Sequence, residues 1–297
     1  MAEQPDAVKL NWEQSDFERK CGFRGSRNTG VNMVFAFALG LLMSVLFYAG
    51  LYPLLSSYYI ATMFYNRGPT QHATVLLACW TFAFLFIKWR KLAFQRQALA
   101  LQVAPLDAGF SLTPETAPQV LERLYAVVDN PKHFLLFARI ELALANLKNL
   151  RRVGDLDEVL RSQAENEENS VESSYTNVKG FIWAIPVLGF IGTVLGLSQA
   201  IGAFGVMLGG STDIAQIKDG LKGVTAGLAT AFETTLVALV AALALQILLN
   251  ALKKREEDFL DDCTEYALRH VVTKLRITDA PDTQSATSPG AAEHQPA

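Results

Sequence analysis

Four stretches of the chain are apolar and free of charged residues over lengths that are unusual for a soluble protein. They cover residues 31–66, 68–87, 181–212 and, with one carboxylate inside it, 223–250. A helix needs about 20 apolar residues to cross the hydrocarbon core of a bilayer. The pattern therefore predicts four membrane spans, at about residues 31–52, 71–89, 181–208 and 221–252.

The polar region between the second and third spans has a helical pattern of its own. Thr113 followed by Pro114 is typical of a helix start, and this helix should end near Asn130. Apolar residues then recur at helical spacing over residues 135–152, and Gly154 is expected to break the pattern.

A further helix is expected to begin at Asp155, because Glu158 three residues later resembles a capping box. It should run through the acidic stretch 165–172 and into the third span without a break. We expect this acidic stretch, together with Arg139 and Glu141 on the preceding helix, to lie on solvated surfaces.

Basic residues set the expected orientation of the spans. They stand before the first span and after the second and fourth: Lys20, Arg24, Arg27, Lys88, Arg90, Lys91, Arg96, Lys253, Lys254 and Arg255. Lys and Arg near span ends accumulate on the cytoplasmic side. We therefore expect a multi-pass protein of the bacterial inner membrane with both termini cytoplasmic, and no cleaved signal peptide.

These elements give a fold class and a domain plan. The fold is expected to be an all-α integral membrane protein, with four transmembrane helices and a helical cytoplasmic domain between spans two and three. The expected order is a cytoplasmic segment at 1–30, spans one and two at 31–89, the cytoplasmic helical domain at 90–179, spans three and four at 180–252, a cytoplasmic helix at 253–277 and a disordered tail at 278–297.

Composition and motifs narrow the function. The net charge is −3, and the three cysteines and four histidines are widely scattered without metal-ligand spacing. Phosphate-binding loops, nucleophile elbows and zinc-binding helices do not occur in the sequence. We expect a protein that is not an enzyme, that binds no cofactor or metal, and that has no nucleic-acid partner.

The third and fourth spans are rich in small residues at one-turn spacing. The residues that we expect to shape these helices are Pro186, Gly189, Gly192, Gly196 and Gly227. Glycines four residues apart let helix backbones approach closely in lipid. The neighbouring helix belongs either to the same chain or to another copy in a ring, and the motif alone does not decide between them.

Polar groups in the same two spans are the candidate functional residues. A carboxylate inside a membrane helix costs about 2.5–3.5 kcal/mol on insertion scales, so Glu233 is expected to face a wet path or a polar partner. We predict an ion pathway formed by Thr193, Thr230 and Glu233, with Thr225 and Thr234 as secondary candidates. The alternative for Glu233 is a protonated side chain that bonds Thr230 or Thr234 for packing only.

The motifs resemble a known family. Residues 185–196, Ile-Pro-Val-Leu-Gly-Phe-Ile-Gly-Thr-Val-Leu-Gly, are similar to the third span of MotA-type stators and in part to TolQ and ExbB. Residues 227–231, Gly-Leu-Ala-Thr-Ala, resemble the last span of these proteins. The similarity covers about residues 175–252, and the four-span topology is closer to MotA than to the three-span TolQ and ExbB.

The resemblance implies a stator-type ion-channel subunit. It implies a homopentameric ring around a single-span MotB-, TolR- or ExbD-like partner whose intramembrane Asp accepts H⁺ or Na⁺. Thr193 and Thr230 occupy the positions of the family's pathway threonines, and Pro186 that of the pore-side proline. The driven process stays open.

Two features depart from the family pattern. The fourth span lacks the proline of flagellar MotA, and Thr225 stands where ExbB has a glutamate, while Glu233 lies further along the helix.

Two other functions stay open. A small-molecule transporter should show two related halves with broken helices, which the span pairs lack. A non-conducting membrane scaffold is disfavoured only by the polar residues in the spans.

Overall fold

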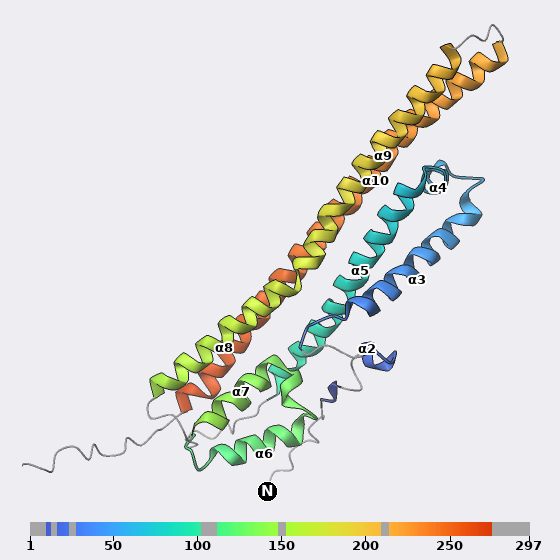
Figure 1. Cartoon of the computed structure of the whole chain (residues 1–297). Helices are drawn as coiled ribbons and strands as arrows, with labels where there is room; N and C mark the ends of the chain where they lie inside the picture. Colours follow the sequence, from blue (N-terminus) through green and yellow to red (C-terminus); the bar gives the residue numbers. More distant parts are fainter. Residues whose placement is uncertain are drawn as a thin grey trace, which may run out of the picture.

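The computed structural model describes residues 10–12, 17–23, 28–101, 112–147, 153–208 and 214–274 (Figure 1). The longer helices of these residues are α3 Met33–Leu51, α4 Tyr59–Tyr65, α5 Pro69–Gln95, α6 Ala117–Val127, α7 Leu135–Asn146, α8 Val153–Ser174, α9 Thr176–Leu208 and α10 Ile214–His270. Short elements are α2 Phe17–Lys20 and the 3₁₀ turns η1 Tyr52–Leu54, η2 Arg96–Ala100, η3 Pro131–His133 and η4 Val272–Lys274. The expected tail, residues 278–297, lies outside the described residues.

Four helical stretches of the described chain are long and apolar enough to cross a membrane. They are Met33–Leu54, Pro69–Ala100, Leu156–Met207 and Ile217–Lys274. This confirms the prediction of an all-helical protein with four candidate spans. Each stretch overlaps its expected span, and the third and fourth continue well beyond it into the polar regions.

Helices α9 and α10 form one long antiparallel hairpin. Figure 1 shows the pair as a rod that reaches well past the end of the peripheral hairpin, which we define as α3, α4 and α5. Large apolar side chains remain exposed along both helices of the rod, including Trp183, Phe190, Phe232 and Leu243. A single chain therefore leaves much apolar surface for lipid or other subunits to cover.

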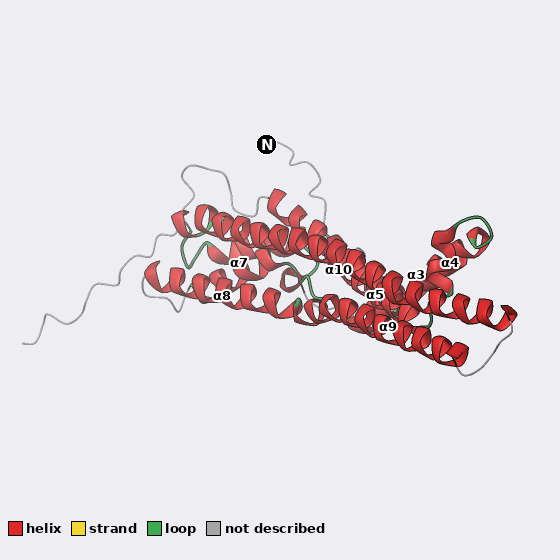
Figure 2. Ribbon diagram, turned by 90° about the horizontal axis from the view of Figure 1, so that it is seen from above, coloured by secondary structure: helices red, strands yellow, loops and turns green. Residues whose placement is uncertain are grey.

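The peripheral hairpin packs against one side of this rod through α5. Helix α3 is capped by Asn32, the residue before its first turn, whose side chain accepts a hydrogen bond of 3.0 Å from the Val34 amide. A Cβ on Gly40 would lie 2.5 Å from the Trp80 Cα, so the missing side chain lets α3 and α5 touch. Helix α5 in turn contacts both α9 and α10, while α3 lies on its outer side (Figures 1 and 2).

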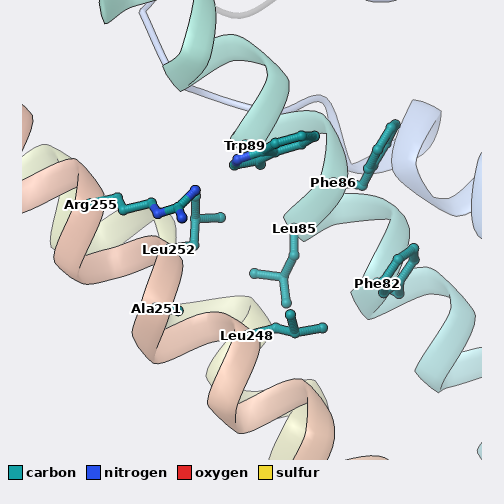
Figure 3. Close-up of a pocket in the computed structure, with 8 residues that line it drawn as sticks. All are labelled: Phe82, Leu85, Phe86, Trp89, Leu248, Ala251, Leu252 and Arg255. Atoms are coloured by element: carbon teal, nitrogen blue, oxygen red, sulfur yellow. The ribbon is translucent and has the colours of Figure 1, made fainter.

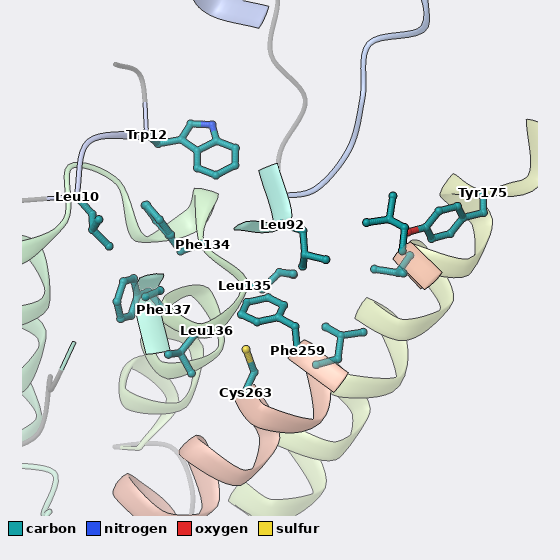
Figure 4. Close-up of a cluster of buried hydrophobic side chains, with 14 of the residues drawn as sticks. Leu10, Trp12, Leu92, Phe134, Leu135, Leu136, Phe137, Tyr175, Phe259 and Cys263 are labelled. Atoms are coloured by element: carbon teal, nitrogen blue, oxygen red, sulfur yellow. The ribbon is translucent and has the colours of Figure 1, made fainter. Parts of the chain in front are cut away.

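The opposite end of the rod carries a compact helical domain, the end domain, made of α6, α7, α8 and the last turns of α10. Its core brings Phe134, Leu136, Phe259 and Cys263 together, with Trp12 of the N-terminal segment packed edge-on against Phe134 (Figure 4). Each of these five side chains is at most 2% exposed. Trp12 is thus part of the domain core.

Buried ions in the end domain correct one expectation. Arg139 is 1% exposed, and its guanidinium pairs with Glu167 and donates to the Thr264 hydroxyl at 2.7 Å. The predicted solvated surface is therefore wrong for Arg139 and for Glu167 in the acidic stretch. Glu141 is half-buried and accepts a hydrogen bond from the Tyr125 hydroxyl.

Several predicted boundaries were also wrong. Helix α10 continues to His270, so no break separates the fourth span from the expected helix at 253–277. Gly154 lies inside α8, and α6 begins at Ala117 after a turn at residues 114–116. The helix expected to enter the third span unbroken is interrupted at Tyr175, whose side chain turns inward to Glu256.

Candidate functional site

The glycines of the third and fourth spans pack α9 and α10 of one chain together. A Cβ on Gly196 would lie 2.7 Å from the Gly227 carbonyl oxygen, and one on Gly227 would lie 2.7 Å from the Gly196 carbonyl oxygen. A Cβ on Gly189 would lie 2.6 Å from the Ala238 Cβ, and one on Gly192 would lie 2.5 Å from the Thr234 hydroxyl oxygen. The small residues therefore serve the contact within the chain, which was one of the two alternatives that the motif left open.

Close approach brings two threonines together across the hairpin. The Thr193 hydroxyl hydrogen-bonds the Thr235 hydroxyl and lies 3.0 Å from the Ala231 carbonyl oxygen. The Thr235 hydroxyl lies 3.0 Å from the Gly189 carbonyl oxygen. Thr193 is thus paired with Thr235, a residue that was absent from the predicted site.

Two further polar side chains continue the line of Thr235 along α10. Gln246 and Asn250 follow Thr235 by 11 and 15 residues, about three and four helical turns, so they share its face. Both are exposed, and the Gln246 amide donates to the Asn250 side chain at 2.9 Å. We call Thr193, Thr235, Gln246 and Asn250 the polar face.

The polar face lies away from the peripheral hairpin. Side chains that meet the hairpin across an apolar groove include Val237, Ala241 and Ala244 of α10, which face Thr74 and Ala78 of α5. Thr235 stands two residues before Val237, about 200° around the helix. In the single chain Gln246 and Asn250 are therefore exposed, whereas Thr193 and Thr235 are half-buried in the contact between α9 and α10.

The other predicted pathway threonines lie elsewhere on α10. Thr230 is 8% exposed and donates to the Ala226 carbonyl, whereas Thr234 is 1% exposed and donates to the Thr230 carbonyl. Thr225 is exposed and bonds the Leu221 carbonyl of its own helix. The structure does not bring Thr230 into contact with Thr193, so a shared pathway for these two residues stays a prediction.

Glu233 faces the peripheral hairpin. Its carboxylate is held by Arg67, with Nε to Oε2 at 2.8 Å and Nη2 to Oε1 at 2.9 Å, and it also accepts a hydrogen bond from the Tyr59 hydroxyl. Arg67 lies in the turn before α5, where Gly68 has a φ of +86° and Pro69 starts the helix. The expected partners Thr230 and Thr234 bond backbone carbonyls instead.

Pro186 lies inside α9, half-buried, and shares the side of α9 that carries Thr193, since seven residues are about two turns. Proline removes the hydrogen bond to the carbonyl four residues earlier. Pro186 therefore cannot donate the usual helical hydrogen bond to the carbonyl of Ile182.

An apolar groove of about 300 Å³ opens between α5 and α10 nearer the end domain (Figure 3). Phe82, Trp89 and Leu248 form its walls, and Arg255 is the charged residue of its lining. Groups of three or more His, Cys, Asp and Glu that could hold a metal ion do not occur within the described residues.

The comparison with protein families gives one match. Residues 129–265 match the model of the MotA/TolQ/ExbB proton channel family, from the start of η3 to the last turns of α10. Curated proteins and solved structures gave no match.

Proposed function

Because the chain is a member of the MotA/TolQ/ExbB proton channel family through residues 129–265, we propose that it is the ion-channel subunit of a motor that converts ion-motive force into mechanical work. The matched segment contains all four residues of the polar face. Four apolar helices agree with a multi-pass membrane protein. The specific stator role is our inference.

The polar face is the observation that carries this proposal. Hydroxyl and amide side chains on a lipid-facing helix would lose their hydrogen bonds to water, so Gln246 and Asn250 favour a wet or protein-covered neighbour. Because Thr193 and Thr235 lie on the same side, a ring of chains that turned this side inward would enclose a polar channel. The expected homopentamer is such a ring.

The ring would need a central partner. We propose a single-span protein of the MotB, TolR or ExbD kind, whose intramembrane Asp takes up H⁺ or Na⁺ and passes it along the polar face. A charge that crosses 100 mV releases about 2.3 kcal/mol, which is enough to bias a rotation step. Neutral hydroxyls and amides suit this task because they solvate an ion without the strong attraction of a fixed charge.

The proposed setting is the bacterial inner membrane with both termini and the end domain in the cytoplasm. Lys88 and Lys91 of α5, and Lys253 and Lys254 of α10, gather where the rod enters the end domain. Positive charge of this kind accumulates on the cytoplasmic side. Apolar side chains that remain exposed on α9 and α10 would then contact lipid or neighbouring subunits.

The test is ion flux in liposomes that contain the full chain with a copurified single-span partner. Thr193→Val should abolish ion-dependent flux without loss of the complex, because the methyl group replaces the hydroxyl at nearly constant volume. The matched control is Thr81→Val, since Thr81 is a buried threonine of α5 that bonds the Leu77 carbonyl of its own helix.

Two results would contradict the proposal. The first is purification of the chain as a monomer that binds no single-span membrane protein, which would favour a transporter or scaffold. The second is unchanged flux in Thr193→Val. Thr230→Val belongs in the same series, because a loss equal to that of Thr193→Val would place Thr230 on the same route.

A further inference from the structure

Arg67 and Glu233 form a bidentate ion pair. Two parallel N–H···O bonds of 2.8 and 2.9 Å join the guanidinium to the carboxylate, and each side chain is 13% exposed. Bidentate pairs of this kind fix orientation as well as distance. The Tyr59 hydroxyl completes the group, because it donates to the carboxylate and accepts from Arg67 Nη2 at 3.3 Å.

The three residues come from separate parts of the fold. Tyr59 starts α4 and Arg67 stands in the turn that leads into α5, whereas Glu233 belongs to α10. The ion pair therefore joins the outermost turn of the peripheral hairpin to the long hairpin. Sequence separation of 166 residues makes it a tertiary contact that local structure does not supply.

A second ion pair, which is buried, joins α5 to α10 at the other end of their contact. Lys88 of α5 lies 3.1 Å from Glu256 of α10, and the two side chains are 1% and 0% exposed. The Tyr175 hydroxyl donates to Glu256 at 2.6 Å, just as Tyr59 donates to Glu233. Each end of the α5–α10 contact therefore consists of a cation, a glutamate and a tyrosine.

The spacing of the two pairs matches one crossing of a membrane. Lys88 follows Arg67 by 21 residues and Glu256 follows Glu233 by 23 residues, which correspond to about 32 and 35 Å of helix. The hydrocarbon core of a bilayer is about 30 Å thick. Between the pairs the groove that separates α5 from α10 is lined by apolar side chains apart from Thr74, and apolar helices in lipid have little driving force that fixes their register.

We propose that Arg67 and Glu233 form a clasp that fixes the peripheral hairpin to the long hairpin at the outer end of α5, with Lys88 and Glu256 as its counterpart at the inner end. Glu233 is then a positioning residue and carries no ion. Its carboxylate is neutralised by Arg67, and Glu233 lies on the side of α10 away from Thr235. The clasp does not depend on the proposed ion flux, since it concerns how two hairpins of one chain are held together.

The test is exchange of the two charges in the full-length chain in lipid nanodiscs, measured by thermal unfolding. Arg67→Glu alone and Glu233→Arg alone should each lower Tm by several degrees, because each leaves like charges in contact. The double variant Arg67→Glu/Glu233→Arg should recover at least half of that loss. Tyr59→Phe should cause a smaller loss, because the charged pair survives.

An exposed pair in the end domain provides the matched control. Arg269 and Glu265 form an ion pair one helical turn apart, with side chains that are 71% and 58% exposed. Exchange of these charges should leave Tm nearly unchanged, because ion pairs between exposed side chains contribute little to stability. This control separates the effect of the clasp from a general response to charge reversal.

Two outcomes would overturn the proposal. One is a double variant that is no more stable than the worse single variant. The other is a Glu233→Gln variant that unfolds at the wild-type Tm but has lost ion flux in the reconstituted complex, because Glu233 would then act on the ion itself. Loss of flux in Thr193→Val concerns the proposed function and leaves the clasp unaffected.

Discussion

Gly196 of α9 and Gly227 of α10 lie so close that a Cβ on either residue would meet the carbonyl oxygen of the other at 2.7 Å. Both carbonyls belong to regular helices, so neither can move without disturbing the hydrogen bonds of its own helix. At Gly196 and Gly227 the two helices of the hairpin are therefore in direct backbone contact. The Thr193–Thr235 hydrogen bond lies next to it, because Ala231 touches both Gly196 and the Thr193 hydroxyl.

A methyl group on Gly196 should destabilise this contact. The added Cβ would lie 2.6 Å from the Ala231 nitrogen and 2.7 Å from the Gly227 oxygen, so the helices must separate. We expect Gly196→Ala to lose about 1–3 kcal/mol, the usual cost of overpacking, measured by thermal unfolding in nanodiscs. The control is Gly202→Ala, whose Cβ would meet no atom of the described chain within 4 Å; equal losses in the two variants would refute the close-contact explanation.

Removal of the amides on α10 should impair ion flux and not folding. Gln246→Leu and Asn250→Leu replace exposed polar groups by apolar groups on a helix that crosses the membrane, so stability should stay the same or rise. If the polar face lines the ion route, flux through the reconstituted complex should fall at least tenfold. Leu243→Ala is the control, because Leu243 is an exposed neighbour on α10 without a polar group; wild-type flux in both amide variants would remove them from the route.

The sequence was sufficient for the four spans and for the family because both depend on local patterns. Charge-free runs of helical length predict spans through the cost of burying charge, and this cost does not depend on the rest of the fold. The glycine spacing likewise predicted close helix packing. Only the tertiary structure shows which helix supplies this contact. It is α10 of the same chain, through Gly227.

The partner of Glu233 could not be found by the same reasoning. Thr230 stands about one turn before Glu233 and Thr234 directly follows it, so hydrogen bonds to them were the alternative to an ion pathway, but both hydroxyls bond backbone carbonyls. Arg67 stands 166 residues earlier, in the turn before α5, so local sequence patterns could not indicate this contact. Gln246 and Asn250 could have been predicted from the sequence, because they lie on the same helical face as Thr235, about three and four turns further along.

Gln71 is expected to make the fold less stable than a leucine at the same position would. The side chain is 0% exposed, and neither its amide nitrogen nor its oxygen has a hydrogen-bond partner among the described residues. A buried amide without partners costs about 1–3 kcal/mol. We expect Gln71→Leu to raise Tm, with Gln95→Leu as the opposite control, because Gln95 donates to the His133 carbonyl and accepts from the Leu135 amide. A lower Tm in Gln71→Leu would show that the amide has a bound partner that stabilises the fold.

Loss of one member of the Arg139–Glu167 pair should be far more damaging than loss of both. Arg139 and Glu167 have side chains that are 1% and 6% exposed, so removal of either leaves a buried charge without a counterion. We expect Arg139→Met to cost about 3–5 kcal/mol, measured by thermal unfolding of the full chain. Arg139→Met/Glu167→Leu should recover most of this loss, since apolar side chains of similar size suit the surrounding core. The exposed pair of Lys254 and Asp258 supplies the control, because Lys254→Met should leave stability almost unchanged. If the double variant were as unstable as Arg139→Met, the cost would lie in lost packing or in the Thr264 hydrogen bond, and the ion pair would not explain it.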